Sequence, residues 1–161
     1  MRVRAELRIL RCEIDARASA TVEAQPFWPC RKGCDHCCRH LAGLPVVTPP
    51  EEELPREGIA ALDEAARAGV EERFRALGAA PERPVVCPLL DAATGACLVY
   101  EQRPVACRTY GFYVERDKGL YCGEIERAVA AGEYGDVVWG NQAGVQARMT
   151  GWGPARTLQF P

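Results

Sequence analysis

The chain has 161 residues, enough for one domain with a sizeable core, since most domains contain about 100–150 residues. Its 20 Lys and Arg against 22 Asp and Glu give a net charge of −2, which argues against a broad basic face for nucleic acid. No apolar run approaches the roughly 20 residues that cross a bilayer, and the mixed charges of residues 2–7 do not resemble a signal peptide. We therefore expect a cytoplasmic protein with neither nucleic acid nor membrane as a partner.

The first expected element is an amphipathic helix in the N-terminal segment 1–24. Leu7, Leu10 and Ile14 recur every three or four residues between charged side chains, which is the helical period. The apolar stripe is narrow, so we expect this helix to lie on the outside of the fold. Cys12 lies off the stripe and is far from the next cysteine.

The periodicity ends in residues 25–50, where prolines and glycines punctuate a segment with four cysteines and both histidines. Without a repeating apolar face, burial alone cannot order such a loop, so another force is expected to do so. A helix is then expected after Thr48, because Thr48 and Glu51 have the spacing of a capping box. Pro55 is expected to interrupt it, and a longer amphipathic helix from Ile59 should end at Gly78.

Residues 79–131 return to short elements. Leu98–Tyr100 suits either a strand fragment or a helical turn, and 112–114 is the better strand candidate, closed by a turn at 117–119. Residues 122–131 suit a short helix, and the tail 132–161 has no clean period. The expected fold is a small, mostly α single domain with irregular cysteine-rich loops organised around a metal centre. Its metal-binding part would span 25–131, with the tail packed on it.

The cysteines carry the strongest chemical signal, because nine are present in a chain expected to be cytoplasmic. Apart from Cys12, they form two groups of four. These groups are Cys30, Cys34, Cys37 and Cys38, and Cys87, Cys97, Cys107 and Cys122. A Cys-x2-Cys turn lets two thiolates converge on one ion, and thiolates select zinc, copper(I) or iron–sulfur clusters. All eight are therefore candidate ligands for Zn²⁺ or an iron–sulfur cluster, in one or two sites.

The adjacent pair Cys37 and Cys38 leaves the stoichiometry open. Neighbouring side chains point in different directions, and to opposite faces where the chain is extended. The pair is therefore not expected to serve one mononuclear tetrahedral site. Either one thiol is a spectator, or the pair addresses two metals or a multi-iron cluster.

Four further residues are candidates for supporting such a site from close by. Cys37-x2-His40 has ligand spacing, whereas His36 is expected to be an exposed loop histidine. A four-thiolate zinc site carries a charge of −2, so Arg103 and Arg108 could stabilise it. Tyr100 belongs to the same run of residues as Arg103 and is expected to pack near the site.

Disulfides, a redox switch and buried structural thiols account for the cysteines less well. A disulfide framework would suit a secreted chain with an even number of cysteines, but nothing in the sequence suggests secretion and the total is odd. A thioredoxin-type switch would need a βαβ context, which the pattern lacks. Buried structural thiols are not distributed in tight clusters within loops rich in proline and glycine. Metal binding is therefore the favoured interpretation.

The full pattern resembles the YkgJ-like cysteine-cluster family, named for its CxxCxxCC signature. The resemblance rests on Cys34-x2-Cys37-Cys38, on Cys87-Pro88-Leu89-Leu90, and on the run from Cys97 through Arg103-Pro104 to Cys107-Arg108. It covers about residues 30–122 and implies a domain that chelates zinc or iron. The Cys30-x3-Cys34 spacing is one residue longer than the signature, and Cys122 lies beyond its most recognisable part. Some relatives with this cluster are flagellin lysine methylases, which implies that the cluster can lie beside methyl-transfer chemistry.

The resulting hypothesis is a cytoplasmic metal-binding protein whose partner is a metal ion, with a protein partner also considered. The chain shows no Ser-His-Asp arrangement, paired-carboxylate motif or phosphate-binding glycine loop, so catalysis is not expected. Two alternatives stay open. The first is an iron–sulfur-dependent redox or protein-modifying enzyme, or its accessory. The second is a metal carrier or sensor that uses surplus thiols for transfer.

Overall fold

The computed structural model describes residues 2–78 and 80–160, and helices make up about half of them. Met1 and Pro161, the outermost residues of the expected end segments, lie outside this described part. The chain divides into two compact units, each assembled from two separate segments. Unit 1 comprises Met1–Arg31 and Val105–Pro154, and unit 2 comprises Lys32–Pro104 and Ala155–Pro161. The expectation of a helical fold with irregular loops is confirmed to the extent that about half of the described residues are helical, with a few short strands. The organisation around a metal centre and the boundaries of the metal-binding part stay predictions.

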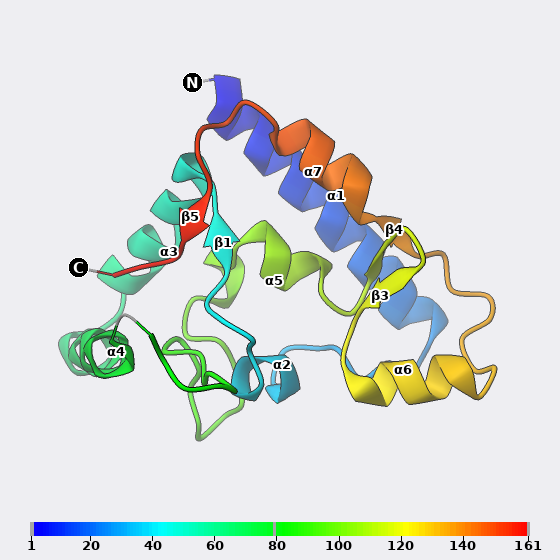
Figure 1. Cartoon of the computed structure of the whole chain (residues 1–161), viewed down its shortest axis with the longest axis horizontal. Coiled ribbons are helices and arrows are strands. Elements are labelled where there is room, and N and C mark those ends of the chain that lie inside the picture. Colours follow the sequence, from blue (N-terminus) through cyan, green and yellow to red (C-terminus); the bar gives the residue numbers. More distant parts are fainter. Residues whose placement is uncertain (1, 79, 161) are drawn as a thin grey trace. The chain divides into compact units, whose positions relative to one another are not determined.

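Unit 1 is built on the long helix α1 (Arg2–Ala24), which confirms the expected N-terminal helix. Its buried residues include Leu7, Leu10 and Ile14, the apolar stripe seen in the sequence. Three shorter helices belong to the same unit: α5 (Val105–Thr109), α6 (Gly123–Ala130) and α7 (Gln142–Met149). Helix α7 runs beside α1 (Figure 1), and Arg148 of α7 forms an ion pair with Glu13 of α1.

A three-stranded sheet completes unit 1, in the order β3 (Lys118–Leu120), β2 (Tyr113–Glu115) and β4 (Gly140–Asn141). The expected strand at 112–114 is confirmed in β2, which pairs antiparallel with β3 and parallel with β4. The expected turn at 117–119 is wrong by about two residues. Arg116 supplies the positive φ of 54° that closes the hairpin, so Lys118 and Gly119 belong to β3.

Unit 2 contains the short helix α2 (His36–Arg39), α3 (Pro49–Ala60), α4 (Glu64–Leu77) and the 3₁₀ helix η1 (Tyr100–Gln102). Strand β1 (Val46–Val47) pairs antiparallel with β5 (Arg156–Thr157), so the end of the tail belongs to this unit. Of the two possibilities for Leu98–Tyr100, the structure supports the helical turn. The hydrophobic core of unit 2 consists of Val47, Ile59, Val70, Leu89, Val99 and Leu158.

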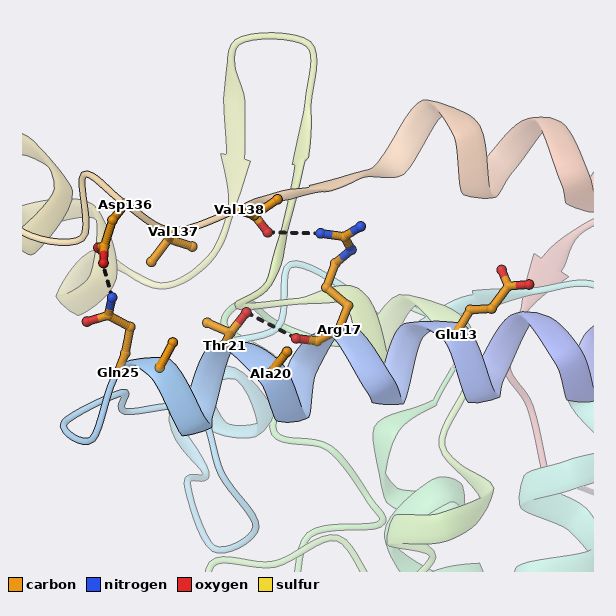
Figure 2. A pocket seen from close by; sticks show the side chains of 9 residues that line it. Glu13, Arg17, Ala20, Thr21, Gln25, Asp136, Val137 and Val138 are labelled. Carbon is orange, nitrogen blue, oxygen red and sulfur yellow. Dashed lines mark hydrogen bonds between the residues drawn. The ribbon is translucent and has the colours of Figure 1, made fainter.

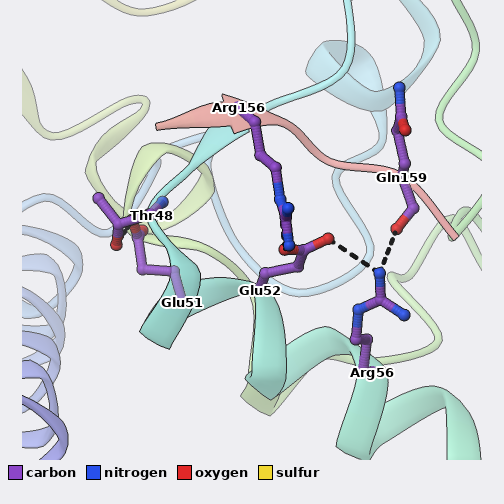
Figure 3. Close-up of polar contacts among 6 residues, drawn as sticks. All are labelled: Thr48, Glu51, Glu52, Arg56, Arg156 and Gln159. Atoms are coloured by element: carbon purple, nitrogen blue, oxygen red, sulfur yellow. Dashed lines mark hydrogen bonds and ion pairs between the residues drawn. The ribbon is translucent and has the colours of Figure 1, made fainter. Parts of the chain in front are cut away.

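Helix α3 begins at the expected capping box, in which the Glu51 carboxylate accepts hydrogen bonds from the Thr48 N–H and hydroxyl at 2.9 and 2.8 Å (Figure 3). The expectation that Pro55 interrupts the helix is wrong. Pro55 removes one intrahelical hydrogen bond, but it is buried together with Ile59, and the helix continues to Ala60. The break comes at residues 61–63 instead, where Asp63 caps α4. Helix α4 then ends before Gly78, as expected.

An acidic residue of α3 holds the C-terminal strand of unit 2. The Glu52 side chain is only 4% exposed and forms ion pairs with Arg56 and Arg156 (Figure 3). Burial by itself would raise the pKa of Glu52, but the hydrogen bonds from the two arginines outweigh burial and hold this pKa below its usual value. Arg56 also donates to the Gln159 carbonyl oxygen at 3.4 Å. These contacts explain why β5 stays on unit 2.

Candidate metal centre

The structure distributes the eight candidate cysteines over both units, and none of the nine cysteines forms a disulfide. Unit 2 contains five of them, namely Cys34, Cys37, Cys38, Cys87 and Cys97. Unit 1 contains the candidates Cys30, Cys107 and Cys122, and also Cys12, which is exposed on α1. The two sequence groups of four therefore do not correspond to the two units.

Main-chain hydrogen bonds within unit 2 bring two cysteine segments together. Leu41 and Val85 form an isolated antiparallel bridge, with N–H···O distances of 3.1 and 2.8 Å. Two residues further along, the Cys87 N–H donates to the Cys38 carbonyl oxygen at 2.7 Å. The loop after α2 therefore lies next to the residues that immediately precede Cys87.

A second main-chain bridge positions Cys97. Leu90 pairs with Cys97, and the Leu98 N–H donates to the Leu89 carbonyl oxygen at 2.8 Å. The connecting turn needs Gly95, whose φ is +69° and where a Cβ atom would lie 2.6 Å from the Gly33 carbonyl oxygen. Leu89, two residues after Cys87, and Val99, two residues after Cys97, are both buried in the core of unit 2. Burial therefore contributes to the order of these loops. The sequence did not indicate this, because it has no repeating apolar pattern in these segments.

Four thiols interact as a consequence: those of Cys37, Cys38, Cys87 and Cys97, hereafter the four-thiol group. A hydrogen bond to Cys38, reinforced by burial, raises the pKa of Cys37 far above its usual value. The same hydrogen bond lowers the pKa of Cys38, but a hydrogen bond to Cys87 and burial outweigh it and raise that pKa to about 12. Both shifts in pKa favour the protonated form of these two thiols.

The fourth thiol, that of Cys97, interacts electrostatically with Arg103 and with another thiol of the group. Burial raises the pKa of Cys97, while a hydrogen bond from the Val99 N–H and the charge of Arg103 oppose that rise. The Cys97 thiol also interacts electrostatically with Cys37. An N–H donor and a cation beside a sulfur both stabilise its thiolate form, which is the form that binds metal.

The neighbours Cys37 and Cys38 do not point to opposite faces. They lie within the single turn of helix α2, where the chain is not extended, and their thiols are hydrogen-bonded to each other. Neighbouring side chains point to opposite faces only where the chain is extended, so that expectation does not apply to this pair. Across residues 2–78 and 80–160, however, no three Cys, His, Asp or Glu side chains already stand in a geometry that would hold an ion. The four thiols form a linked chain of neighbours.

The other four candidate cysteines have different surroundings. Cys34 follows Gly33, whose carbonyl oxygen approaches Gly95 closely, so the Cys34 loop runs near the turn before Cys97. In unit 1, the Cys30 sulfur lies against the backbone of Gly111, where a Cβ atom would be only 2.4 Å from it. Cys107 is part of helix α5, and the buried Cys122 is the N-cap of α6; their role as ligands stays a prediction.

The two histidines lie at the start and end of helix α2, and both are exposed. Their rings stack with centroids 4.6 Å apart. His40 Nδ1 lies 2.8 Å from the His36 carbonyl oxygen, which can only accept, so Nδ1 carries the proton and Nε2 is the nitrogen with a lone pair. The expected exposure of His36 is confirmed, while metal ligation by His40 stays a prediction.

Tyr100 and Arg103 pack together beside Cys97. Arg103 Nε donates to the Tyr100 carbonyl oxygen at 2.8 Å, and its guanidinium carbon lies 3.5 Å from the centre of the tyrosine ring. Lys32 Nζ also lies over this ring, at 5.3 Å. The ring thus holds Arg103 in a fixed position through a cation–π contact. The Val99 N–H is a specific part of this surrounding that the sequence analysis did not identify.

Arg108 has a different set of surroundings within unit 1. Its side chain is 2% exposed, and Nη1 donates to both carboxylate oxygens of Asp15 at 2.6 and 2.7 Å. This ion pair joins α5 to α1. A buried guanidinium needs such a counter-charge to offset the loss of its hydration.

A separate cavity of about 360 Å³ lies in unit 1, between α1 and residues 136–138 (Figure 2). Arg17 donates to the Val138 carbonyl oxygen at its edge, and Gln25 donates to Asp136. The described residues that line it include no cysteine. This cavity is therefore not part of the candidate metal centre.

Residues 29–129 match the model of the CxxCxxCC family, described as "Putative zinc- or iron-chelating domain". The match spans more than half of the chain, and the chain belongs to this family. The resemblance noted in the sequence is thereby confirmed. No curated protein and no solved structure matched the chain. Among the described residues, no helix is long and apolar enough to cross a membrane.

Proposed function

We propose that this protein binds zinc or iron through cysteine thiolates and that the four-thiol group of unit 2 is its primary site. The observation that carries the proposal is the linkage of Cys37, Cys38, Cys87 and Cys97 within a family of zinc- or iron-chelating domains. Thiolates are the ligands that zinc and iron–sulfur centres favour. Cys30, Cys34, Cys107 and Cys122 are proposed as further ligands.

The surroundings of the four-thiol group support this proposal. The Val99 N–H and the charge of Arg103 act on Cys97, and the Cys38 N–H acts on Cys37. Such N–H donors and nearby cations offset the negative charge of a thiolate site. A bound cation would displace the thiol protons, which couples metal binding to proton release and to stability. The metal itself would supply either a structural crosslink or, as iron–sulfur, a redox centre.

The test is elemental analysis and visible absorption of protein purified without oxygen. We expect stoichiometric zinc, or iron with acid-labile sulfide, in the wild-type protein. Cys38→Ser should lose most of this metal, because Cys38 is hydrogen-bonded to both Cys37 and Cys87. Cys12→Ser is the matched control, since Cys12 is exposed on α1 and outside both cysteine groups. Metal-free wild-type protein, or full metal content in Cys38→Ser, would refute the proposal.

A further inference from the structure

A cavity of about 500 Å³ in unit 2 is lined by one member of the four-thiol group, Cys87. Two arginines also line it, Arg39 from α2 and Arg73 from α4. The rest of the wall includes the apolar side chains Leu90 and Leu98. A site of this kind combines a sulfur ligand with cationic and apolar surfaces, which a purely structural metal centre does not need.

Each arginine donates a hydrogen bond within the protein through its Nε atom. Its two terminal nitrogens can therefore donate to a ligand. Arg73 Nε donates to the Pro88 carbonyl oxygen at 2.7 Å, and Arg39 Nε donates to Asp35 at 2.5 Å. For the described residues, the structure gives the terminal nitrogens of Arg39 and Arg73 no hydrogen-bond acceptor. A guanidinium fixed in this way presents a planar pair of donors suited to an oxyanion.

A glycine in helix α4 leaves space for the Arg73 side chain. Gly69 lies one turn earlier in α4, and a Cβ atom there would stand 3.3 Å from Arg73 Nη1. Glycine inside a helix costs about 1 kcal/mol relative to alanine, and here it leaves room for the guanidinium to lie over the helix. Asp91 also lines the cavity, and the charge of Arg73 acts on it. The two Asp91 carboxylate oxygens accept hydrogen bonds from the Ala93 N–H and the Thr94 hydroxyl and not from Arg73.

We infer that this cavity binds a small organic oxyanion, a carboxylate or a phosphate with an apolar body, next to Cys87. The arginines hold the anionic group, and Leu90 and Leu98 contact the apolar part. That this ligand would lie beside a metal rests on the proposed function, whereas the binding of its anionic group by Arg39 and Arg73 does not.

The test titrates benzoate and phenyl phosphate into metal-analysed wild-type protein, with neutral benzamide as the control ligand. We expect at least one anion to shift the backbone amide signals of Gly69, Val86 and Leu98 saturably, and benzamide to leave them unchanged. Arg73→Gln and Arg39→Gln should each weaken the binding by about tenfold or more, because each removes charge-assisted hydrogen bonds. Arg75→Gln, on the same helix but paired with Glu72, should bind like the wild type.

Three results of the ligand titrations would overturn the inference: neither anion binds the wild-type protein, benzamide binds equally well, or binding survives in both arginine variants. Loss of metal from Arg73→Gln would also overturn it, because the arginine would then serve the thiols. Wild-type protein that binds benzoate but contains no metal would refute the proposed function and leave the oxyanion site standing. The two failures are therefore distinguishable.

Discussion

The backbone N–H of Cys87 donates a hydrogen bond of 2.7 Å to the carbonyl oxygen of Cys38. This bond joins the segment that contains Cys38 to the segment that contains Cys87, and the thiols of these two residues are also hydrogen-bonded to each other. Because it involves only main-chain atoms, it does not depend on the protonation or oxidation of either thiol. Substitution of a thiol should therefore change the chemistry of the group while the two segments stay paired.

The first prediction concerns Arg103, whose charge acts on Cys97 and whose position is fixed by Tyr100. Arg103→Gln should lower metal affinity about 10–100-fold, the usual effect of removing a group that supports a metal ligand. Competition with a chromophoric chelator measures this directly. Arg103→Lys keeps the charge and should recover part of the affinity, whereas Arg116→Gln, in the exposed hairpin turn, should have no effect. Equal affinity in wild type and Arg103→Gln would show that the arginine only packs.

The second prediction concerns the turn before Cys97. Gly95→Ala should lower the free energy of unfolding by about 1–2 kcal/mol or more, because alanine disfavours a positive φ and its Cβ would clash with the Gly33 carbonyl. Chemical denaturation measures the change, and metal content should fall with it. Gly43→Ala is the control, since nothing lies within 4 Å of a Cβ at that position. If both variants are equally stable, the turn does not require glycine.

The third prediction is a pH dependence that arises from Glu52. The pKa of Glu52 in the folded protein is below its unfolded value, so its ion pairs contribute stability above about pH 4.5. This contribution is lost as the pH falls through the folded pKa. Glu52→Gln should therefore be less stable than wild type by about 1–3 kcal/mol at pH 7, with a smaller difference near pH 3. Urea denaturation at a series of pH values tests this.

Glu72→Gln is the matched control for this series. Glu72 forms an ion pair with Arg75, but its side chain is 68% exposed, against 4% for Glu52. Exposed pairs of this kind contribute about 0–1 kcal/mol. A difference between wild type and Glu52→Gln that stays constant from pH 3 to 7 would argue against a charged Glu52 as its source.

The fourth prediction separates two roles for Arg108. If its main partner is Asp15, Asp15→Asn should destabilise the protein by about 2 kcal/mol, because it removes the negative charge that faces a buried guanidinium. Metal content should stay the same in this variant. Thermal unfolding and elemental analysis give both readouts, with Asp117→Asn in the exposed hairpin turn as the control. Loss of metal from Asp15→Asn would assign Arg108 to the metal centre instead.

The sequence predicted the elements that have local signals. Leu7, Leu10 and Ile14 identified α1, the Thr48 and Glu51 spacing identified the start of α3, and Gly78 identified the end of α4. These signals are local because capping and helical periodicity involve residues within a few positions of each other. The identity of the eight candidate cysteines and the family also followed from the sequence alone.

The remaining features depend on contacts between distant residues. Strands β1 and β5 have two residues each and pair across most of the chain, so no local pattern marks them. The short helix α7 was missed because only Gln142 and Val145 are buried in it, which is too little for a visible period. The grouping of Cys37 and Cys38 with Cys87 and Cys97 depends on main-chain bridges that join segments far apart in sequence.

Leu158 is buried in the core of unit 2, although residues 105–154 of unit 1 separate it from the rest of that core. During synthesis on the ribosome, residues 32–104 emerge long before Leu158 is made. Unit 2 therefore cannot complete its core while the chain is still growing through residues 105–154. The thiols of Cys37, Cys38, Cys87 and Cys97 consequently leave the ribosome in a chain whose core is unfinished, so firm metal retention should follow translation and not accompany it.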